Sequence, residues 1–429
     1  MTVTKIERRP IAVDLYAGAG GMSLGFEQAG FDVLAAVEID PIHCAVHEFN
    51  FPFWSVICKS ATEITAREIR NRSNIGNKEI DLVFGGPPCQ GFSLIGKRHL
   101  EDPRNNLLSH FLRLVLELKP KYFVMENVKG ITLGKHRELL AEVIKNFNNN
   151  GYRVEEKYQV LNAANYGVPQ NRERLFLIGC RADLNLPKYP QPKTIPPKQK
   201  NNSNLPKTPT VIYAIGDLPE VNDYPELNKQ DWTLAEYGKP SNYAAQLRGL
   251  EIVKNDFSIP RKWDSRIITC SLNTKHTQKS ITRFAETKQG KTEPISRFFK
   301  LSPNGLCNTL RAGTPSSRGA YTSPRPIHPF TPRCITVREA ARLHSYPDWF
   351  RFHVTKWHGF RQIGNSVPPL LAKAIAQEII KVLNVEPIKP TREQKLGNEQ
   401  LISFKMAQAA RYYNVDSQTI APRSRKRKK

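Results

Sequence analysis

Residues 11–38 read IAVDLYAGAGGMSLGFEQAGFDVLAAVE, and this stretch decides the fold class. The apolar run Ile11–Tyr16 ends in the glycine-rich turn Ala17–Gly21, and Met22–Ala29 follows with apolar residues at helical spacing. A second apolar run then ends at Glu38. Strand, glycine turn, helix and strand together predict an α/β protein with a parallel, doubly wound sheet, which binds ligands at the carboxyl ends of its strands.

The alternation continues beyond this unit. Ile80–Phe84 and Tyr122–Met125 are two more short, apolar runs, and Leu107–Leu118 between them has helical spacing. Seven prolines then fall between Pro187 and Pro209, a density that favours extended or irregular backbone. We therefore predict a first domain over residues 1–180 and a boundary after it.

Charge indicates the partner. The chain has 64 Lys and Arg against 39 Asp and Glu, a net charge of +25, which argues for a polyanion such as nucleic acid. Residues 254–333 hold fifteen basic and four acidic residues, so we interpret them as a nucleic-acid face, with a solvated basic loop region as the alternative. Six of the last seven residues, Arg423–Lys429, are basic, which fits a localisation or DNA-binding tail or a disordered, solvated one.

Several classes of protein are excluded or disfavoured. No run of 18 apolar residues occurs, so no membrane-spanning helix is predicted, and the N-terminus lacks the apolar core of a secretory signal. The seven cysteines show no C-x-x-C spacing, so neither a zinc site nor a disulfide framework is indicated. We expect free thiols in a reducing compartment.

The glycine turn predicts a cofactor. Glu38 lies 20 residues after Gly18, where a carboxylate accepts hydrogen bonds from ribose hydroxyls. An adenosine-containing cofactor fits this arrangement. A nicotinamide enzyme, or a tight turn without a ligand, shows the same pattern.

Three further strand ends carry reactive side chains. Gly85–Ser93 (GGPPCQGFS) follows a strand and places Cys89 at the ligand face, where a thiolate acts as a nucleophile; the alternative is a buried hydrophobe. Glu126 ends the next strand, and Gln170–Arg174 (QNRER) precedes another; a helix cap and a solvated charge run are the alternatives. Cysteine, glutamate and arginine at one edge of a sheet form a catalytic arrangement. Arg361–Pro369 (RQIGNSVPP) is typical of a helix start.

Taken in order, these segments resemble the cytosine-5 DNA methyltransferase family over residues 11–180 and about 305–385. The resembling segments are Asp14–Gly21, Pro87–Gln90, Glu126–Val128, Gln170–Arg174, Arg333–Glu339 and Gly364–Val367. Tyr16 stands where the family usually has Phe, and Ser60 where it usually has an Asp that contacts adenine.

The resemblance implies a fold and a domain order. The fold is a doubly wound, Rossmann-like S-adenosylmethionine-dependent methyltransferase domain with a second, smaller target-recognition domain. Residues 1–180 are then the catalytic and cofactor-binding domain, residues 181–304 the target-recognition domain, and residues 305–390 a return to the catalytic domain. Residues 391–429 form a basic C-terminal tail.

It also implies roles for single residues. Cys89 adds to carbon 6 of cytosine, Glu126 protonates ring nitrogen 3, Arg174 holds the carbonyl oxygen, and Arg172 positions the loop or the acid. The residues implied to bind S-adenosylmethionine are Tyr16, Gly18, Gly20, Gly21, Glu38, Ser60, Leu107 and Asn365. Those implied to bind DNA are Gln90, Ser93 and Arg104, the last of them gripping a phosphate.

The activity implied is methylation of carbon 5 of a cytosine flipped out of a short, specific duplex sequence. The enzyme would be a cytoplasmic bacterial monomer, either paired with a restriction endonuclease that acts separately on the same site or a solitary methyltransferase. Three alternatives stay open: a tRNA cytosine methyltransferase of the same family, a non-catalytic DNA-binding relative and a nicotinamide oxidoreductase. The first is disfavoured because the chain lacks a Cys-Phe-Thr motif and residues 181–304 leave room for a large recognition region.

Overall fold

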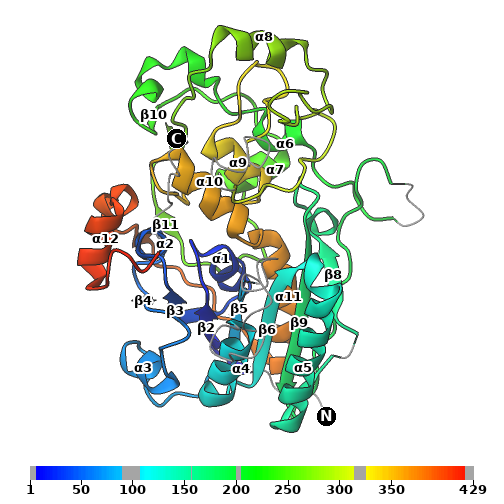
Figure 1. The fold of residues 1–429 in the computed structure, drawn as a ribbon, viewed down its shortest axis with the longest axis vertical. Coiled ribbons are helices and arrows are strands. Elements are labelled where there is room, and N and C mark those ends of the chain that lie inside the picture. Colours follow the sequence, from blue (N-terminus) through cyan, green and yellow to red (C-terminus); the bar gives the residue numbers. More distant parts are fainter. Residues whose placement is uncertain (1–5, 89–106, 156, 200–203, 314–324, 421–429) are drawn as a thin grey trace, which may run out of the picture.

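A central sheet of eight strands organises the larger part of the molecule (Figure 1). The computed structural model describes residues 6–88, 107–155, 157–199, 204–313 and 325–420. The strands lie in the order β4-β3-β2-β5-β6-β9-β7, and β8 also pairs with β9. Their bounds are β2 Ile11–Leu15, β3 Asp32–Glu38, β4 Ser55–Cys58, β5 Leu82–Gly85, β6 Tyr122–Val128, β7 Tyr152–Val154, β8 Gln159–Asn162 and β9 Glu173–Arg181.

The predicted α/β alternation is confirmed, but the sheet is mixed and not wholly parallel. Strands β2 to β6 pair in parallel, whereas β9 runs antiparallel to β6, β7 and β8. The apolar pattern of a buried strand is the same in either direction, so the sequence carried no signal for this reversal. The reversal matters because it brings the amino end of β9 to the carboxyl end of β6.

Helices cover both faces of the sheet. Alternate residues of β2 point to opposite faces, so Ala12 packs in one apolar core and Val13 in the other. The first core includes side chains of α1 (Gly21–Gln28), α2 (Pro41–Asn50) and α11 (Pro369–Leu383). The second includes those of α3 (Ala66–Asn71), α4 (Leu107–Leu118) and α5 (Lys135–Asn149). The sheet is therefore doubly wound, as predicted.

Helix α11 joins the C-terminal part of the chain to the glycine turn. A Cβ atom added at Gly25 would lie 2.5 Å from both Ala372 Cβ and Pro369 O. One added at Gly21 would lie 2.6 Å from Val367 O. Only glycine lets α1 and α11 approach this closely. Residues 367–372 therefore lie in direct contact with α1.

A second lobe lies above the sheet in Figure 1 and has little regular structure. Its short elements are α6 Val211–Ile215, β10 Thr233–Leu234, α7 Asn242–Leu247, β12 Ile267–Ile268 and α8 Gln278–Glu286. Helices α9 (Val337–Leu343) and α10 (Lys356–Asn365) lie at the base of this lobe (Figure 1). Strand β11 (Arg261–Lys262) lies within the predicted recognition segment 181–304. It pairs with β14 (Gln394–Lys395), which lies outside that segment.

The stretch predicted as a tail from residue 391 is folded as far as residue 420. It contains β14, the short helix η8 (Glu399–Ser403) and α12 (Met406–Tyr413). The hydroxyls of Tyr412 and Tyr413 each donate to one carboxylate oxygen of Glu48 in α2, at 2.6 Å. The basic run Arg423–Lys429 lies outside the described residues.

The described ranges show no sign of a membrane span or of a metal site. None of their helices is both long and apolar enough to span a bilayer. They also contain no group of three or more His, Cys, Asp and Glu side chains placed to hold a metal ion.

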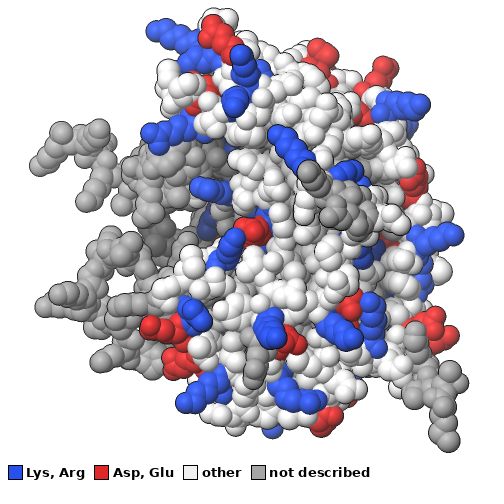
Figure 2. Space-filling view, turned by 90° about the vertical axis from the view of Figure 1, so that its right-hand side faces the viewer, with Lys and Arg blue, Asp and Glu red and all other residues white. Residues whose placement is uncertain are grey.

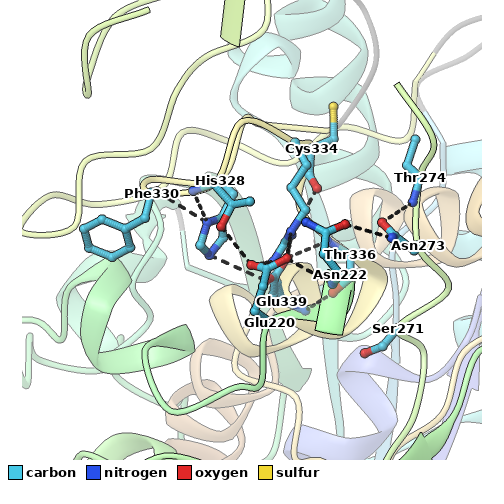
Figure 3. A network of polar contacts seen from close by, with 12 residues as sticks. Glu220, Asn222, Ser271, Asn273, Thr274, His328, Phe330, Cys334, Thr336 and Glu339 are labelled. Carbon is cyan, nitrogen blue, oxygen red and sulfur yellow. Dashed lines mark hydrogen bonds and ion pairs between the residues drawn. The ribbon is translucent and has the colours of Figure 1, made fainter. Parts of the chain in front are cut away.

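A buried ionic network fixes the second lobe to α9 (Figure 3). The Arg333 guanidinium donates to both carboxylate oxygens of Glu339, at 2.8 and 2.9 Å, and to those of Glu220, at 2.9 and 3.0 Å. Glu339 also closes a capping box with Thr336 at the start of α9. Burial alone would raise the pKa of the Glu339 carboxyl, but Arg333, His328 and the hydrogen bond from the Thr336 N–H together outweigh it and lower that pKa to about 2.

This network predicts an acid-sensitive contribution to stability. A carboxyl whose pKa is lowered on folding stabilises the native state above its unfolded pKa, and this stabilisation is lost as the pH falls towards about 2. We expect Glu339→Gln to lower the free energy of unfolding by about 3 kcal/mol at pH 7, and the difference from the wild type to narrow below about pH 5. Urea denaturation between pH 7 and the lowest pH at which both proteins fold measures it. A difference that stays constant with pH would contradict the pairing, and Glu378→Gln, whose partner Lys381 is 67% exposed, is the control.

Candidate active site

The turn after β2 has the backbone conformation that its glycines predict. Tyr16, Gly18 and Gly20 all have positive φ, at 61°, 55° and 98°. A Cβ added at Gly20 would lie 2.5 Å from the ring of Phe51, whereas one added at Gly18 would meet nothing within 4 Å. The turn is therefore packed tightly behind Gly20 and open beside Gly18.

Glu38 is bound directly to this turn. The backbone N–H of Gly18 donates to Glu38 Oε2 at 2.8 Å, and Oε1 accepts from the N–H groups of Ile39 and Asp40 at 3.0 and 2.8 Å. The carboxylate is thus held in one orientation at the carboxyl end of β3. Gly18 and Glu38, predicted from spacing alone to act together, are in contact.

Leu107 and Ser60 are placed near the turn by different contacts. The Tyr16 hydroxyl donates to the Leu107 carbonyl at 2.8 Å, and burial raises the pKa of Tyr16, which keeps the phenol a neutral donor. Ser60 lies two residues after the end of β4, where Cys58 pairs with Glu38 across the strands. Its hydroxyl oxygen is 2.7 Å from that of Thr62 and accepts from the Thr62 N–H at 3.2 Å. Ser60 therefore shapes the turn beside Glu38.

Asn365 reaches the turn through its neighbours. It is the last residue of α10 and is exposed, and Ser366 and Val367 after it lie against Gly21. The helix start predicted at this motif is confirmed at its last residue, because Pro369 is the first residue of α11. Residues 366–367 and the glycine turn after β2, far apart in the sequence, thus meet at Gly21.

Glu126 and Arg174 form a close ion pair at the carboxyl end of β6. Arg174 Nε lies 2.8 Å from Glu126 Oε1, and both side chains are nearly buried, at 12% and 11% exposure. The pair depends on the reversed strand, because the antiparallel register sets Arg174 opposite Val128. Two of the predicted catalytic residues are therefore together.

Burial changes the acidity of this pair. It raises the pKa of Glu126 above its ordinary range, although the charges of Arg174 and Arg172 oppose the shift. It also lowers the pKa of Arg174, which the Glu126 carboxylate opposes. A glutamic acid with a raised pKa is suited to donate a proton near neutral pH.

The segment that leads to Cys89 passes directly over Glu126. A Cβ added at Gly86 would lie 2.7 Å from Glu126 Oε2, and Asn127 Nδ2 donates to the Pro87 carbonyl at 3.0 Å. Gly86 therefore leaves the space that the carboxyl occupies. The predicted nucleophile and the predicted DNA contacts, Cys89, Gln90, Ser93 and Arg104, lie outside the described residues.

Arg172 connects two parts of the site from within the core. Its guanidinium donates to the carbonyls of Leu310, Gly364 and Ser366, at 2.7, 2.7 and 2.8 Å, and the residue is fully buried. The last two carbonyls flank Asn365. Arg172 thus holds the Asn365 segment against the strand that carries Arg174, which makes it a positioning residue.

Other side chains near the Glu126–Arg174 pair were not assigned a role from the sequence. Gln170 Nε2 lies 2.9 Å from His344 Nδ1, and His344 Nε2 lies 3.1 Å from the Ser366 carbonyl, so both brace the segment that Arg172 holds. A pocket of about 500 Å³ beside Arg174 is lined in part by Asn162 and Thr309. No motif marked these two residues, because they come from separate parts of the chain.

Not all basic side chains of the stretch 254–333 are available to a nucleic acid, and the face proposed there stays a prediction. Arg261, Lys300 and Arg333 in it are buried. Lys300 Nζ donates to the Phe284 carbonyl, and Arg333 belongs to the network of Figure 3. On the face shown in Figure 2, Lys and Arg lie over both the upper and lower parts with Asp and Glu between them. Part of the excess positive charge therefore lies on buried side chains that bind other groups of the protein.

Comparison with known proteins identifies the family. The model of the C-5 cytosine-specific DNA methylase family matches residues 11–381. The chain is 58% identical to Type II methyltransferase M.XorII of Xanthomonas oryzae, over 97% of this chain and 95% of that protein. It is 35% identical to Type II methyltransferase M.DdeI of Desulfomicrobium norvegicum, over 86% of this chain and 88% of that one.

A solved structure agrees. An E. coli prophage protein described as a DNA modification methyltransferase aligns with a TM-score of 0.69 and 35% identity, covering 87% of this chain and 99% of that one. These matches leave no support for a nicotinamide oxidoreductase, which rested on the glycine turn and Glu38. The chain belongs to the C-5 cytosine-specific DNA methylase family and is a DNA cytosine-5 methyltransferase.

Proposed function

We propose that this enzyme methylates a cytosine that has been flipped out of a specific duplex sequence, with Glu126 and Arg174 binding the base. The 2.8 Å contact between Arg174 Nε and Glu126 Oε1, beside the segment leading to Cys89, carries the proposal. A base inside a duplex cannot be approached from its face, so the target must leave the stack at a cost of a few kcal/mol.

Each side chain has one task in this scheme. The Cys89 thiolate adds to carbon 6, and the electrons displaced from the ring double bond make carbon 5 nucleophilic. Glu126 gives its proton to ring nitrogen 3, and Arg174 holds the carbonyl oxygen, so negative charge does not build up on the ring. After methyl transfer, water takes the proton from carbon 5, and the bond to Cys89 breaks.

S-adenosylmethionine supplies the methyl group, and the turn after β2 fits it. The open space at Gly18 and the fixed carboxylate of Glu38 suit an adenosine whose ribose hydroxyls donate to that carboxylate. Tyr16, Gly20, Gly21, Ser60, Leu107 and Asn365 complete the proposed cofactor site. Arg172 keeps Asn365 in place there.

The acid role of Glu126 predicts the pH dependence of the reaction. Only the protonated form can donate, so the single-turnover rate should fall as the pH rises through the raised pKa of Glu126. Arg174→Gln removes a charge that lowers this pKa, so the falling limb should move to higher pH while the rate drops roughly 10²–10³-fold. Rates measured between pH 5.5 and 9 test both effects.

The comparison variant is Glu126→Gln. Its single-turnover rate should be roughly 10²–10⁴-fold below that of the wild type, and this rate should no longer fall as the pH rises. A limb that moves to lower pH in Arg174→Gln would contradict the assignment of the acid.

The biological role follows from the relatives' names. Both curated relatives are Type II methyltransferases, so we place this enzyme in a bacterial restriction-modification system. It would act as a monomer in the cytoplasm, protecting double-stranded DNA at a site that a separate endonuclease cleaves.

One labelling experiment tests the proposed function. The purified protein is incubated with methyl-labelled S-adenosylmethionine and unmethylated bacterial DNA, and the labelled base and its sequence context are identified. Label in 5-methylcytosine at one short motif supports the proposal. Label on tRNA alone moves the protein to the tRNA methyltransferases, and label on neither indicates a non-catalytic DNA binder.

A further inference from the structure

A pocket opens beside the ion pair on the side of Arg174. Its volume is about 500 Å³, and it is lined by Lys129 after β6, Asn162 at the end of β8, Asn171, Glu173 and Arg174 around the start of β9, and Thr309. The Thr309 hydroxyl donates to the Asn171 carbonyl at 2.7 Å, so the segment returning from the second lobe closes one wall. Val128 and Gly130 complete the lining, so the pocket has both polar and apolar walls.

Two cations line this pocket, and they differ in how firmly they are held. Arg174 is nearly buried, bound to Glu126 at 2.8 Å and to the carbonyl of Glu173 at 2.8 Å. Lys129 is 58% exposed, and its Nζ lies 3.1 and 3.3 Å from the two carboxylate oxygens of Glu173, itself 49% exposed. An exposed ion pair contributes between zero and about 1 kcal/mol, so Lys129 can exchange its partner at little cost.

The position of the pocket indicates what the new partner is. Lys129 follows Glu126 by three residues and lies at the mouth of a cavity that reaches Arg174. The sugar and phosphates of a nucleotide whose base contacts Glu126 and Arg174 must lie next to these two side chains. This pocket is next to them, because Arg174 forms part of its lining. Lysine binds phosphate as a compact point charge, and hydroxyl and amide side chains such as Thr309 and Asn171 complete many phosphate sites.

We propose that Lys129 binds a backbone phosphate of the strand that carries the target cytosine, and that it leaves Glu173 to do so. The inference rests on the proposed function, which places the base at Glu126 and Arg174. Glu173 pairs with Lys129 in the free enzyme and gives way to the phosphate in the complex. Because its own charge repels the phosphate, Glu173 also weakens binding.

The two partners therefore have opposite predicted effects. Lys129→Met should weaken binding of a duplex carrying the mapped site roughly 5- to 20-fold and reduce the slope of log affinity against log salt by about 0.9, the value for one lost phosphate contact. Glu173→Gln should tighten binding about 3-fold or more while the slope is kept. Lys129→Met should raise KM for DNA. It should leave kcat, the turnover at saturating DNA, within about threefold of the wild type.

A matched control separates this site from a general charge effect. Lys381, which is 67% exposed, also forms an ion pair, with Glu378 at 2.7 Å, but it lies near the end of α11. That helix leads into β13 (Val385–Glu386), which pairs with β1 (Ile6–Glu7) before the amino end of β2, so Lys381 lies away from the catalytic edge. Lys381→Met removes the same charge and should leave the slope unchanged.

The outcomes distinguish the two proposals. Fluorescence anisotropy from 50 to 300 mM salt gives the slopes, and thermal denaturation confirms that the surface variants fold. An unchanged slope in Lys129→Met, or weaker binding in Glu173→Gln, overturns the phosphate contact while wild-type methylation keeps the proposed function. If the wild type does not methylate DNA, both proposals fail together.

Discussion

We expect the Cys89→Ala variant to transfer no methyl groups to DNA, with a rate at least roughly 10⁴-fold below that of the wild type. Carbon 5 of cytosine is a weak nucleophile, and without a thiolate at carbon 6 nothing raises its reactivity. Glu126 and Arg174 remain and still contact the base, so duplex affinity should stay within about threefold of the wild type. Labelled methyl transfer and anisotropy on the same duplex measure the two quantities.

Another cysteine provides the control. Cys180 lies in β9 and is fully buried in the core, with no part in the proposed chemistry. Cys180→Ala should fold with reduced stability and keep its turnover. Turnover by Cys89→Ala above the background of the assay would remove Cys89 as the nucleophile.

The largest expected effect on stability comes from Glu27→Ala. Glu27 in α1 and Arg261 in β11 form a two-point ion pair, at 2.7 and 2.9 Å, whose side chains are fully buried. The guanidinium also lies 4.7 and 4.6 Å from the ring centres of Phe53 and Trp349. Removing the carboxylate leaves a buried cation without its partner, so we expect a loss of about 3–5 kcal/mol in the free energy of unfolding.

A double variant shows whether the charge or the packing is responsible. Glu27→Leu with Arg261→Met fills the same space without charge and should recover most of the stability. Urea denaturation of the wild type and the variants gives the comparison. A loss below about 1 kcal/mol in Glu27→Ala, or a double variant as unstable as the single one, would contradict an essential buried pair.

Much of the fold could be predicted because its signals are local. The glycine turn, the carboxylate after the second strand and the apolar runs each depend on neighbouring residues, and Gly18 and Glu38 do meet. The direction of β9 depends on tertiary pairing, and so the sheet was predicted as parallel. No signal in the sequence marked the folding of residues 391–420, since α12 is short and is held by tyrosine contacts with Glu48 of α2 that no local pattern specifies.

The candidate site shows the same division. Glu126 and Arg174 stand in recognisable motifs, and the structure brings them together. Arg172 stands in the same motif, but its partners are backbone carbonyls at residues 310, 364 and 366, which no motif specifies. A net charge counted from the sequence likewise does not tell whether an arginine such as Arg261 is exposed or buried against Glu27.

The packing of α1 on α11 has a consequence for how the protein is made. Helix α1 ends at Gln28, and its partner begins at Pro369, about 340 residues later. At synthesis rates of ~5–20 residues per second, the surface of α1 that α11 covers stays open for roughly 17–70 s on the ribosome. A contact so distant in sequence also forms late in folding. We therefore expect a nascent chain released before residue 383 to be inactive even though it already carries Cys89, Glu126 and Arg174, and expect activity to begin only after α11 has been synthesised.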